Sequence, residues 1–152
     1  ARRVELAKAV RRRARAFAVA LAEPAEIDGV NILQASLLAM ERAVLRLGLK
    51  PDLLRVDGRQ IPRFDGAEQP FLAEPVVRGD QLVPAISAAS ILAKVCRDRL
   101  MRRWHRRYPH YGFDSNKGYP KPRHLAALSR FGPCPIHRQS FAPVRRAPSA
   151  DA

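Results

Sequence analysis

Two aspartates, Asp57 and Asp80, hold positions from which side chains could do chemistry. Asp57 ends the apolar stretch "LLRVD", and Asp80 ends "AEPVVRGD", 80 − 57 = 23 residues later. If both stretches are strands of one sheet, the two carboxylates emerge at the same edge. Such a pair could hold Mg²⁺ or Mn²⁺, hard ions that prefer oxygen ligands and bridge to phosphate. The alternative is that each aspartate only accepts hydrogen bonds from turn amides.

A second candidate lies in the Gly- and Pro-containing stretch "YGFDSNKGYPKPRH", residues 111–124. It combines three aromatic side chains, Tyr119 among them, with basic groups that include Lys117 and Lys121. Aromatic faces beside basic groups suit stacking on a base or sugar together with phosphate contact. The alternative is a packed loop whose aromatic rings fill the core.

The charge of the chain favours a polyanionic partner. The 152 residues are 47% apolar, enough for the core of one ordinary domain, yet the formal net charge is +14 and the pI is about 11.2. Each basic group set near a phosphate releases a counterion, so nucleic acid is the leading candidate. The alternative is a basic protein from an Arg-rich proteome.

The compartment is predicted from cysteines and hydropathy. Cys96 and Cys134 are too far apart in sequence to indicate a disulfide framework, and "CPIH" lacks a second ligand pair at zinc spacing. The basic residues 11–15 before "AFAVALAEP" resemble a signal peptide, but that apolar stretch is short and mostly alanine. We predict a cytoplasmic protein with no membrane partner.

Hydrophobic periodicity predicts a mixed α/β pattern. Expected elements are a basic helix (3–12), a strand (17–21), a loop (23–31), a helix from the cap Asn31 to Gly48, a strand (53–57), a strand ending at Asp80, a helix from Pro84, and a short helix (123–130). The helix from Pro84 should bury a stripe and expose a basic face that includes Lys94. The stripe is Ile86, Ala89, Ala93, Cys96, Leu100 and Trp104.

The motifs "EIDGVNILQASLLAM", "VDG", "RGD", "AISAASILAKVCRDRLM", "YPHYGFDSNKGYP" and "GPCPIHRQSFAPV" together resemble bacterial ribonuclease HII, the type 2 ribonuclease H. The resemblance runs from about residue 3 to residue 146. It implies a ribonuclease H-like fold, a mixed sheet flanked by helices. It also implies an endonuclease that cuts the RNA strand of RNA/DNA hybrids, including single ribonucleotides embedded in duplex DNA, and leaves a 5′ phosphate.

The same resemblance implies four acids that hold two divalent ions, Mn²⁺ or Mg²⁺. Asp57 and Asp80 match the third and fourth of these acids. Tyr119 matches a tyrosine that stacks on the sugar next to the ribonucleotide. Phosphate contacts are expected from Lys94, Lys117 and Lys121, and the enzyme is expected to be a monomer.

The chain also departs from the family pattern. The Asp-Glu pair and Gly-Arg-Gly loop with which the family opens are absent from the 152 residues. We therefore expect an N-terminally incomplete domain over residues 1–146, without its first two strands, and a disordered tail over 147–152. The alternative function is a catalytically incomplete fragment that only binds nucleic acid. Smaller departures are Arg59, Asn116 where His is common, and Lys121 where Thr is common.

Overall fold

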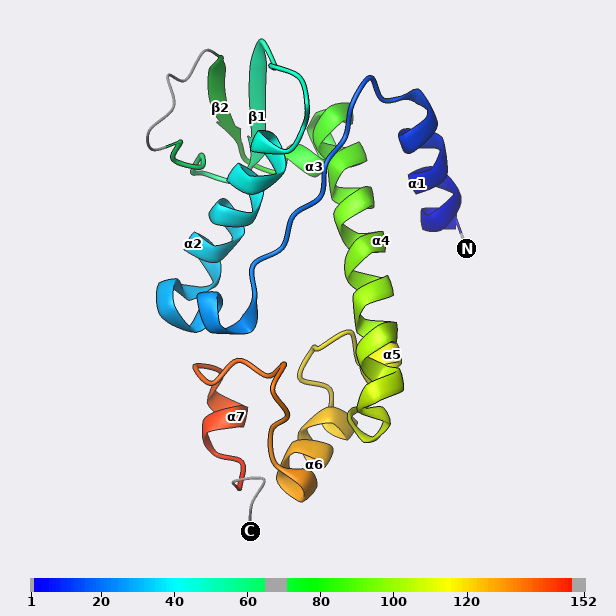
Figure 1. The fold of residues 1–152 in the computed structure, drawn as a ribbon, viewed down its shortest axis with the longest axis vertical. Coiled ribbons are helices and arrows are strands. Elements are labelled where there is room, and N and C mark those ends of the chain that lie inside the picture. Colours follow the sequence, from blue (N-terminus) through cyan, green and yellow to red (C-terminus); the bar gives the residue numbers. More distant parts are fainter. Residues whose placement is uncertain (1, 65–70, 149–152) are drawn as a thin grey trace. The chain divides into compact units, whose positions relative to one another are not determined.

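The computed structural model describes residues 2–64 and 71–148, and it divides into two compact units. Unit 1 comprises Ala1–Ala22 and Leu33–Val95, and unit 2 comprises Glu23–Ile32 and Cys96–Ala152. Helices α2 and α4 contribute residues to both units (Figure 1). Most of the predicted tail lies outside the described residues, and the prediction of one domain over residues 1–146 stays a prediction.

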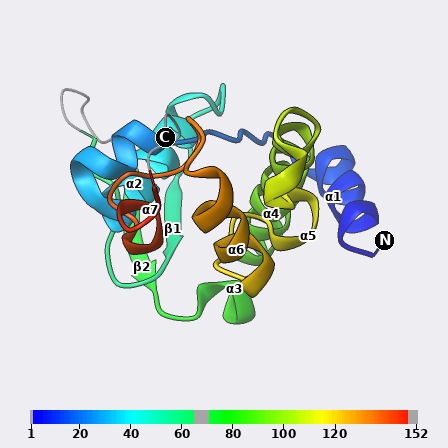
Figure 2. The ribbon, with the colours of Figure 1, turned by 90° about the horizontal axis from the view of Figure 1, so that it is seen from below.

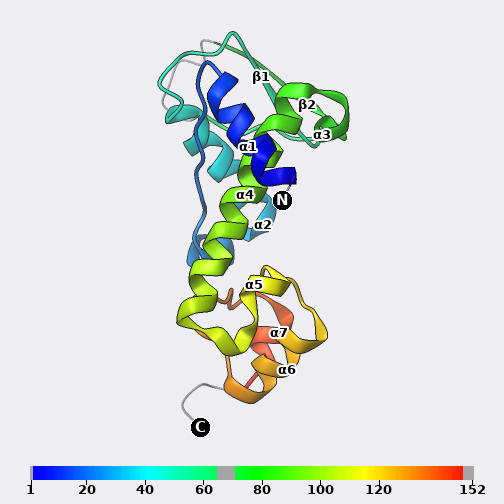
Figure 3. The same cartoon turned by 90° about the vertical axis from the view of Figure 1, so that its right-hand side faces the viewer.

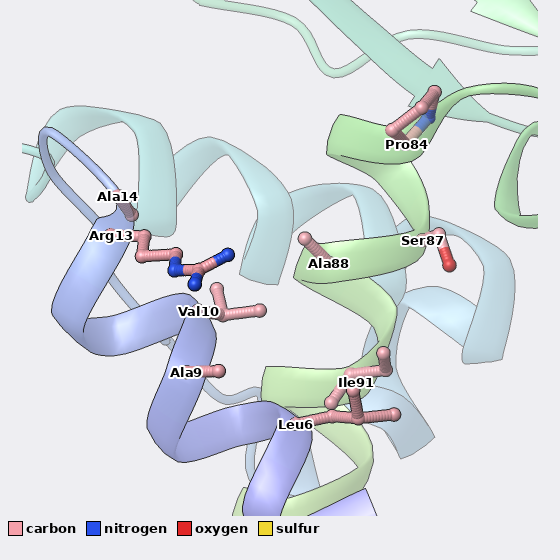
Figure 4. A pocket seen from close by; sticks show the side chains of 9 residues that line it. All are labelled: Leu6, Ala9, Val10, Arg13, Ala14, Pro84, Ser87, Ala88 and Ile91. Carbon is pink, nitrogen blue, oxygen red and sulfur yellow. The ribbon is translucent and has the colours of Figure 1, made fainter.

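The N-terminal helix α1 (Arg2–Arg13) confirms the predicted basic helix and packs on the first half of α4 (Pro84–Arg107) (Figure 3). Ala7 of α1 is buried against Leu92 and Val95 of α4. A groove of about 580 Å³ opens between the two helices (Figure 4). Apart from Arg13 and Ser87 its lining side chains are apolar, so the groove offers little for acid-base or metal chemistry.

The predicted strand over residues 17–21 is wrong. These residues form neither helix nor strand, and Phe17 and Leu21 are more than two fifths exposed. A strand needs a neighbour to bond its backbone N–H and C=O groups. Among the described residues, neither strand lies in register with this segment.

The predicted loop over residues 23–31 is also wrong, because α2 begins at Pro24 and runs to Leu45 (Pro24–Leu45). Pro24 suits the first helical position, and the Glu26 carboxylate accepts the backbone N–H of Glu23 at 2.8 Å. Asn31, the predicted start of the helix, lies inside α2 at a kink, where the backbone leaves helical geometry (φ 69°, ψ 167°). The sequence signal for this start is Pro24 followed by Glu26, whose carboxylate can reach the backbone N–H of Glu23 three residues earlier.

The sheet consists of β1 (Leu53–Asp57) and β2 (Leu72–Val76), which pair in parallel (Figure 1). Asp57 lies opposite Val76 in the register. Pro75 cannot donate a ladder hydrogen bond, which fits an edge strand. The predicted strand over 53–57 is confirmed, but of its apolar side chains only Val56 is buried, and Leu53 is 41% exposed.

Helix α4 begins at Pro84 as predicted, but its buried face differs from the predicted stripe. Ile86 is buried, whereas Ala89 and Ala93 are exposed, and Leu92 and Val95 are buried in their place. The contact with α1 decides which side of α4 is covered, and periodicity along α4 alone could not show that partner.

Unit 2 is built from short helices around an aromatic core. They are η1 (Pro109–Tyr111), α5 (Phe113–Asn116), α6 (Pro122–Phe131), which confirms the predicted helix over 123–130, and α7 (Ala142–Arg145). Figure 2 shows α5 beside the C-terminal end of α4. The core includes Tyr111, Phe113 and Leu128, each at most 2% exposed.

Asp28 joins the start of α2 to the distant segment before α7. Its carboxylate accepts the backbone N–H groups of Gln139 at 2.7 Å and Ser140 at 2.9 Å, and the Ser140 hydroxyl at 2.5 Å. The Ser140 hydroxyl is the main reason that the pKa of Asp28 lies below its ordinary value.

In the described residues no helix is both long and apolar enough to cross a membrane.

Candidate metal and nucleic-acid sites

Asp57 ends β1, as predicted, and its carboxylate faces the turn that follows β2. The Asp57 Oδ1 atom accepts the backbone N–H of Gly79 at 2.8 Å. The ladder continues beside it, because Gly58 donates to the carbonyl of Val76 at 3.0 Å. Thus Asp57 does accept a turn amide, the alternative considered for it, while the residue as a whole stays exposed.

The prediction that Asp80 ends a strand is wrong. Strand β2 stops at Val76, and Asp80 lies in the first turn of α3 (Gly79–Leu82). The chain turns at Arg78, whose backbone is left-handed (φ 57°, ψ 35°). The turn still brings Asp80 to the carboxyl edge of the sheet, because its neighbour Gly79 is bonded to Asp57.

Gly79 fits this turn because it has no side chain. A Cβ atom there would lie 2.5 Å from the Ile86 Cδ1 atom and 3.3 Å from the Val76 Cβ atom. The close packing of β2, α3 and α4 therefore favours glycine at the residue whose amide holds Asp57, since a larger residue would displace the Ile86 side chain. Sequence reasoning treated "RGD" as a strand end and missed this role.

Lys94 of α4 lies beside the acidic pair. Its Nζ atom is 3.9 Å from the Asp80 Oδ2 atom, and both side chains are partly exposed, 54% for Lys94 and 34% for Asp80. The structure therefore brings together three predicted site residues, Asp57, Asp80 and Lys94, within unit 1. An exposed pair of this kind contributes little to stability, so Lys94 is free to exchange Asp80 for another anion.

The two carboxylates fit one hard divalent ion in part. They supply oxygen donors on adjacent elements, and Mg²⁺ commonly takes only one or two carboxylates and keeps water or phosphate oxygens elsewhere. Among residues 2–64 and 71–148, no group of three or more His, Cys, Asp or Glu side chains gathers as a metal cluster. The described chain thus offers half of the four-acid set that the resemblance implied.

The second site is the tyrosine loop, which we define as residues 116–121 of unit 2. Tyr119 is 62% exposed, while Tyr111 and Phe113 are buried in the core. Of the three aromatic residues in the stretch 111–124, Tyr111 and Phe113 therefore fill the core, and Tyr119 is exposed to solvent, where it could stack. The tyrosine loop belongs to unit 2, and the acidic pair belongs to unit 1.

The two lysines of the tyrosine loop fold back on the loop. Lys117 donates from Nζ to the Asp114 carbonyl, and Lys121 lies 3.5 Å from the Ser115 carbonyl. Arg97 of α4 donates to the Lys117 carbonyl at 3.0 Å. Both lysines thus lie within two residues of Tyr119 in sequence, and their ammonium groups contact the carbonyls of residues 114 and 115.

A cluster of histidines lies under this loop without facing solvent. His124 and His137 stack at 5.2 Å between ring centroids, and His137 Nδ1 lies 3.1 Å from Cys134 Sγ. Burial lowers the pKa of His124, and burial together with the neighbouring His124 lowers the pKa of His137 to about 4. Burial also raises the pKa of the Cys134 thiol. The three side chains are buried and the thiol stays protonated near pH 7, so they serve the core of unit 2.

Comparison with known proteins decides the family. Residues 1–144 match the sequence model of the family described as Ribonuclease HII. The chain belongs to the ribonuclease HII family. A ribonuclease HII from Cupriavidus necator is 55% identical over 150 residues, which are 97% of this chain and 61% of the relative. One from Bordetella pertussis is 52% identical over 143 residues, 94% of this chain and 69% of the relative.

The fold agrees with this membership. The crystal structure of the ribonuclease H2 from Pyrococcus horikoshii OT3 superposes with a TM-score of 0.81 at 25% identity, covering 95% of this chain and 74% of that one. The mixed α/β, ribonuclease H-like fold expected from the motifs is thus confirmed. The chain spans about 61 to 69% of the length of the ribonuclease HII relatives named above.

Proposed function

We propose that this chain forms part of an endoribonuclease that hydrolyses the RNA strand of RNA/DNA hybrids, including single ribonucleotides embedded in duplex DNA, with divalent ions. One observation carries the proposal: in a member of the ribonuclease HII family, the parallel strand pair sets Asp57 one hydrogen bond from the turn that presents Asp80. Asp57 and Asp80 would hold the ion, and Mn²⁺ and Mg²⁺ are the ions their oxygen ligands suit. When bound, such an ion supplies positive charge to the phosphate and to the attacking and leaving oxygens.

The chain's own residues have separable roles in this proposal. The Gly79 amide fixes the Asp57 carboxylate through one oxygen, and the other oxygen would ligate the ion. Lys94 neutralises Asp80 before an ion or phosphate arrives. Tyr119 stacks on a sugar, while Lys117 and Lys121 contact phosphates. Choice of RNA over DNA requires contacts to the 2′-OH.

A cleavage assay tests the proposal. The substrate is a labelled DNA duplex with one ribonucleotide, incubated with Mn²⁺ or Mg²⁺, and an all-DNA duplex is the control. Because two carboxylates are half of the expected four, we predict cutting on the order of 10³-fold slower than by a full-length relative. Any cutting should leave a 5′ phosphate and disappear in Asp57→Asn. Cutting that survives Asp57→Asn and Asp80→Asn would exclude these residues as the site.

A second candidate function is nucleic-acid binding without catalysis. The net charge of +14 and the exposed Tyr119 favour it, and so does the lack, among residues 2–64 and 71–148, of any group of three or more possible metal-ligating side chains. The same assay separates the two functions when binding is measured in parallel by fluorescence anisotropy. Tight binding of the hybrid with no metal-dependent cutting at any enzyme concentration would support the second function.

A further inference from the structure

The tyrosine loop is supported from below by a buried amide side chain. Asn116 is only 3% exposed. Its Nδ2 atom donates to the Tyr111 carbonyl at 2.6 Å, and its Oδ1 atom accepts the backbone N–H of Gly118 at 2.8 Å. We propose that Asn116 is a positioning residue for nucleic-acid binding, because it holds the turn that presents Tyr119. This inference rests on the proposed function of the tyrosine loop.

The turn that Asn116 holds is one that the chain adopts reluctantly. Tyr119 donates its N–H to the Asn116 carbonyl at 2.9 Å, which closes a four-residue turn. Both central residues have positive φ, 54° at Lys117 and 80° at Gly118, as in a type I′ turn. Positive φ is unfavourable for a lysine, so side-chain contacts must stabilise the turn.

Two side chains supply those contacts. The Asn116 side chain binds the Gly118 N–H, and Arg97 of α4 donates to the Lys117 carbonyl at 3.0 Å. A Cβ atom on Gly118 would lie 3.2 Å from the Arg97 Nη2 atom, so the turn rests closely on that guanidinium. Arg97 therefore stabilises the backbone of the tyrosine loop through this hydrogen bond.

The other end of the Asn116 amide is anchored in the core. Tyr111 is 2% exposed, and its hydroxyl donates to the Gly132 carbonyl at 2.7 Å. Its own carbonyl takes the Asn116 amide and lies 3.1 Å from His124 Nδ1. A side chain here must offer one donor and one acceptor at once, which an amide does. The turn is thus fixed before substrate arrives, and less ordering entropy is lost when a sugar stacks on Tyr119.

A double-mutant cycle tests this role. The affinity of the chain for an RNA/DNA hybrid is measured by fluorescence anisotropy for wild type, Asn116→Ala, Tyr119→Ala and the double variant. We expect Asn116→Ala and Tyr119→Ala each to weaken binding by about tenfold, near the lower end of the loss seen when one stacking partner is removed. The double variant should bind no more weakly than Tyr119→Ala. Losses that multiply in the double variant would overturn the inference.

Hydrogen exchange tests the same role without substrate. In Asn116→Ala the amides of Gly118 and Tyr119 should exchange at least about tenfold faster, while Leu128 in α6 exchanges as in wild type. Unchanged exchange at Gly118 would overturn the inference. If wild type does not bind the hybrid, the proposed function fails, while the exchange result still decides the positioning role.

A second variant covers the case in which Asn116→Ala does not fold. Asn116→Asp keeps the size and the acceptor for Gly118, but it places a carboxylate oxygen against the Tyr111 carbonyl. We expect faster exchange at Gly118 and weaker hybrid binding than in wild type. Wild-type affinity and exchange in a folded Asn116→Asp would overturn the inference. Asn116→His at pH 8, with one donor and one acceptor nitrogen, should restore binding to within about threefold of wild type.

Discussion

At the scale of single residues, the acidic pair illustrates how one carboxylate can serve structure and chemistry together. Asp57 accepts the Gly79 amide with one oxygen, and the residue is exposed to solvent. Asp80 has an ammonium neighbour, Lys94, that an incoming cation would displace or a phosphate would recruit. The Gly79 amide sets the position of the Asp57 carboxylate, and the turn at Arg78 sets the position of Asp80. Neither position therefore depends on a long flexible side chain.

The buried histidines give a pH dependence of stability. His137 has a pKa of about 4 in the folded chain, against an ordinary value of 6.5. Below pH 6.5 the unfolded chain therefore binds a proton that the folded chain does not bind, and stability falls as the pH falls from 6.5 toward 4. Between pH 7 and 5.5 the loss for His137 should be about 1 kcal/mol.

Urea unfolding of wild type and His137→Gln at pH 7 and 5.5 measures this loss. Glutamine keeps an acceptor but does not titrate, so the variant should lose less stability than wild type over this interval. His124, whose pKa burial also lowers, remains in both proteins, so the difference between them reports His137 together with its interaction with His124. Equal pH dependence in the two proteins would show that His137 is protonated or solvated in the folded state.

At the scale of elements, the turn from β2 into α3 controls the candidate metal site. Gly79→Ala would place a Cβ atom 2.5 Å from Ile86 Cδ1 and 3.3 Å from Val76 Cβ. The Ile86 side chain must then turn aside and Val76 must move by a few tenths of an ångström, which disturbs the turn whose amide holds Asp57. We predict a loss of stability of about 1–3 kcal/mol. Affinity for Mn²⁺, measured by calorimetry, should fall about fivefold.

A matched control is Gly29→Ala in α2, where an added Cβ atom meets nothing within 4 Å. This variant should keep wild-type Mn²⁺ affinity and lose no stability, because alanine favours a helix over glycine. If Gly79→Ala binds Mn²⁺ as wild type does, the Gly79 amide does not set the geometry of Asp57.

Local patterns in the sequence predicted the elements that carry their own signals. The basic helix α1, the strand β1 with Asp57 at its end, the start of α4 at Pro84 and helix α6 were all predicted correctly. Residues 17–21 have strand periodicity, yet a strand exists only beside a partner, and none of the described strands lies there. The sequence pattern alone does not say whether a partner is present.

The parts of the candidate site that sequence could not predict depend on backbone conformation. Asp80 was placed at the end of a short strand over "AEPVVRGD", but the strand stops at Val76 and a helix begins after the left-handed residue Arg78. Asn116 stood out only as a departure from the family pattern. Its role depends on two hydrogen bonds to backbone atoms, of Tyr111 and Gly118, that no residue type announces.

At the scale of the whole molecule, the net charge of +14 predicts strongly salt-dependent binding of nucleic acid. Lys121 is the residue of the tyrosine loop best placed to test one phosphate contact, because its side chain is exposed. In Lys121→Ala the slope of log K against log salt should fall in magnitude by about 0.9 for duplex substrates. Affinity for the hybrid would be measured by fluorescence anisotropy between about 50 and 200 mM salt, an interval over which such contacts change affinity strongly.

The control for charge alone is Lys8→Ala in α1, where the lysine pairs with Glu5 at 3.0 Å. It removes the same charge from the chain and should leave the slope unchanged within error. Equal slopes for Lys121→Ala and wild type would place the phosphate contacts elsewhere on the molecule.

The central claim is that Asp57 and Asp80 together hold a divalent ion. Mn²⁺ is paramagnetic, so adding it in small amounts to the isotope-labelled chain should broaden the amide signals nearest the bound ion. The account predicts selective broadening at Asp57, Gly58, Gly79 and Asp80, and loss of that broadening in Asp57→Asn and Asp80→Asn. Broadening that is absent there in wild type, or that persists in both variants, would contradict it.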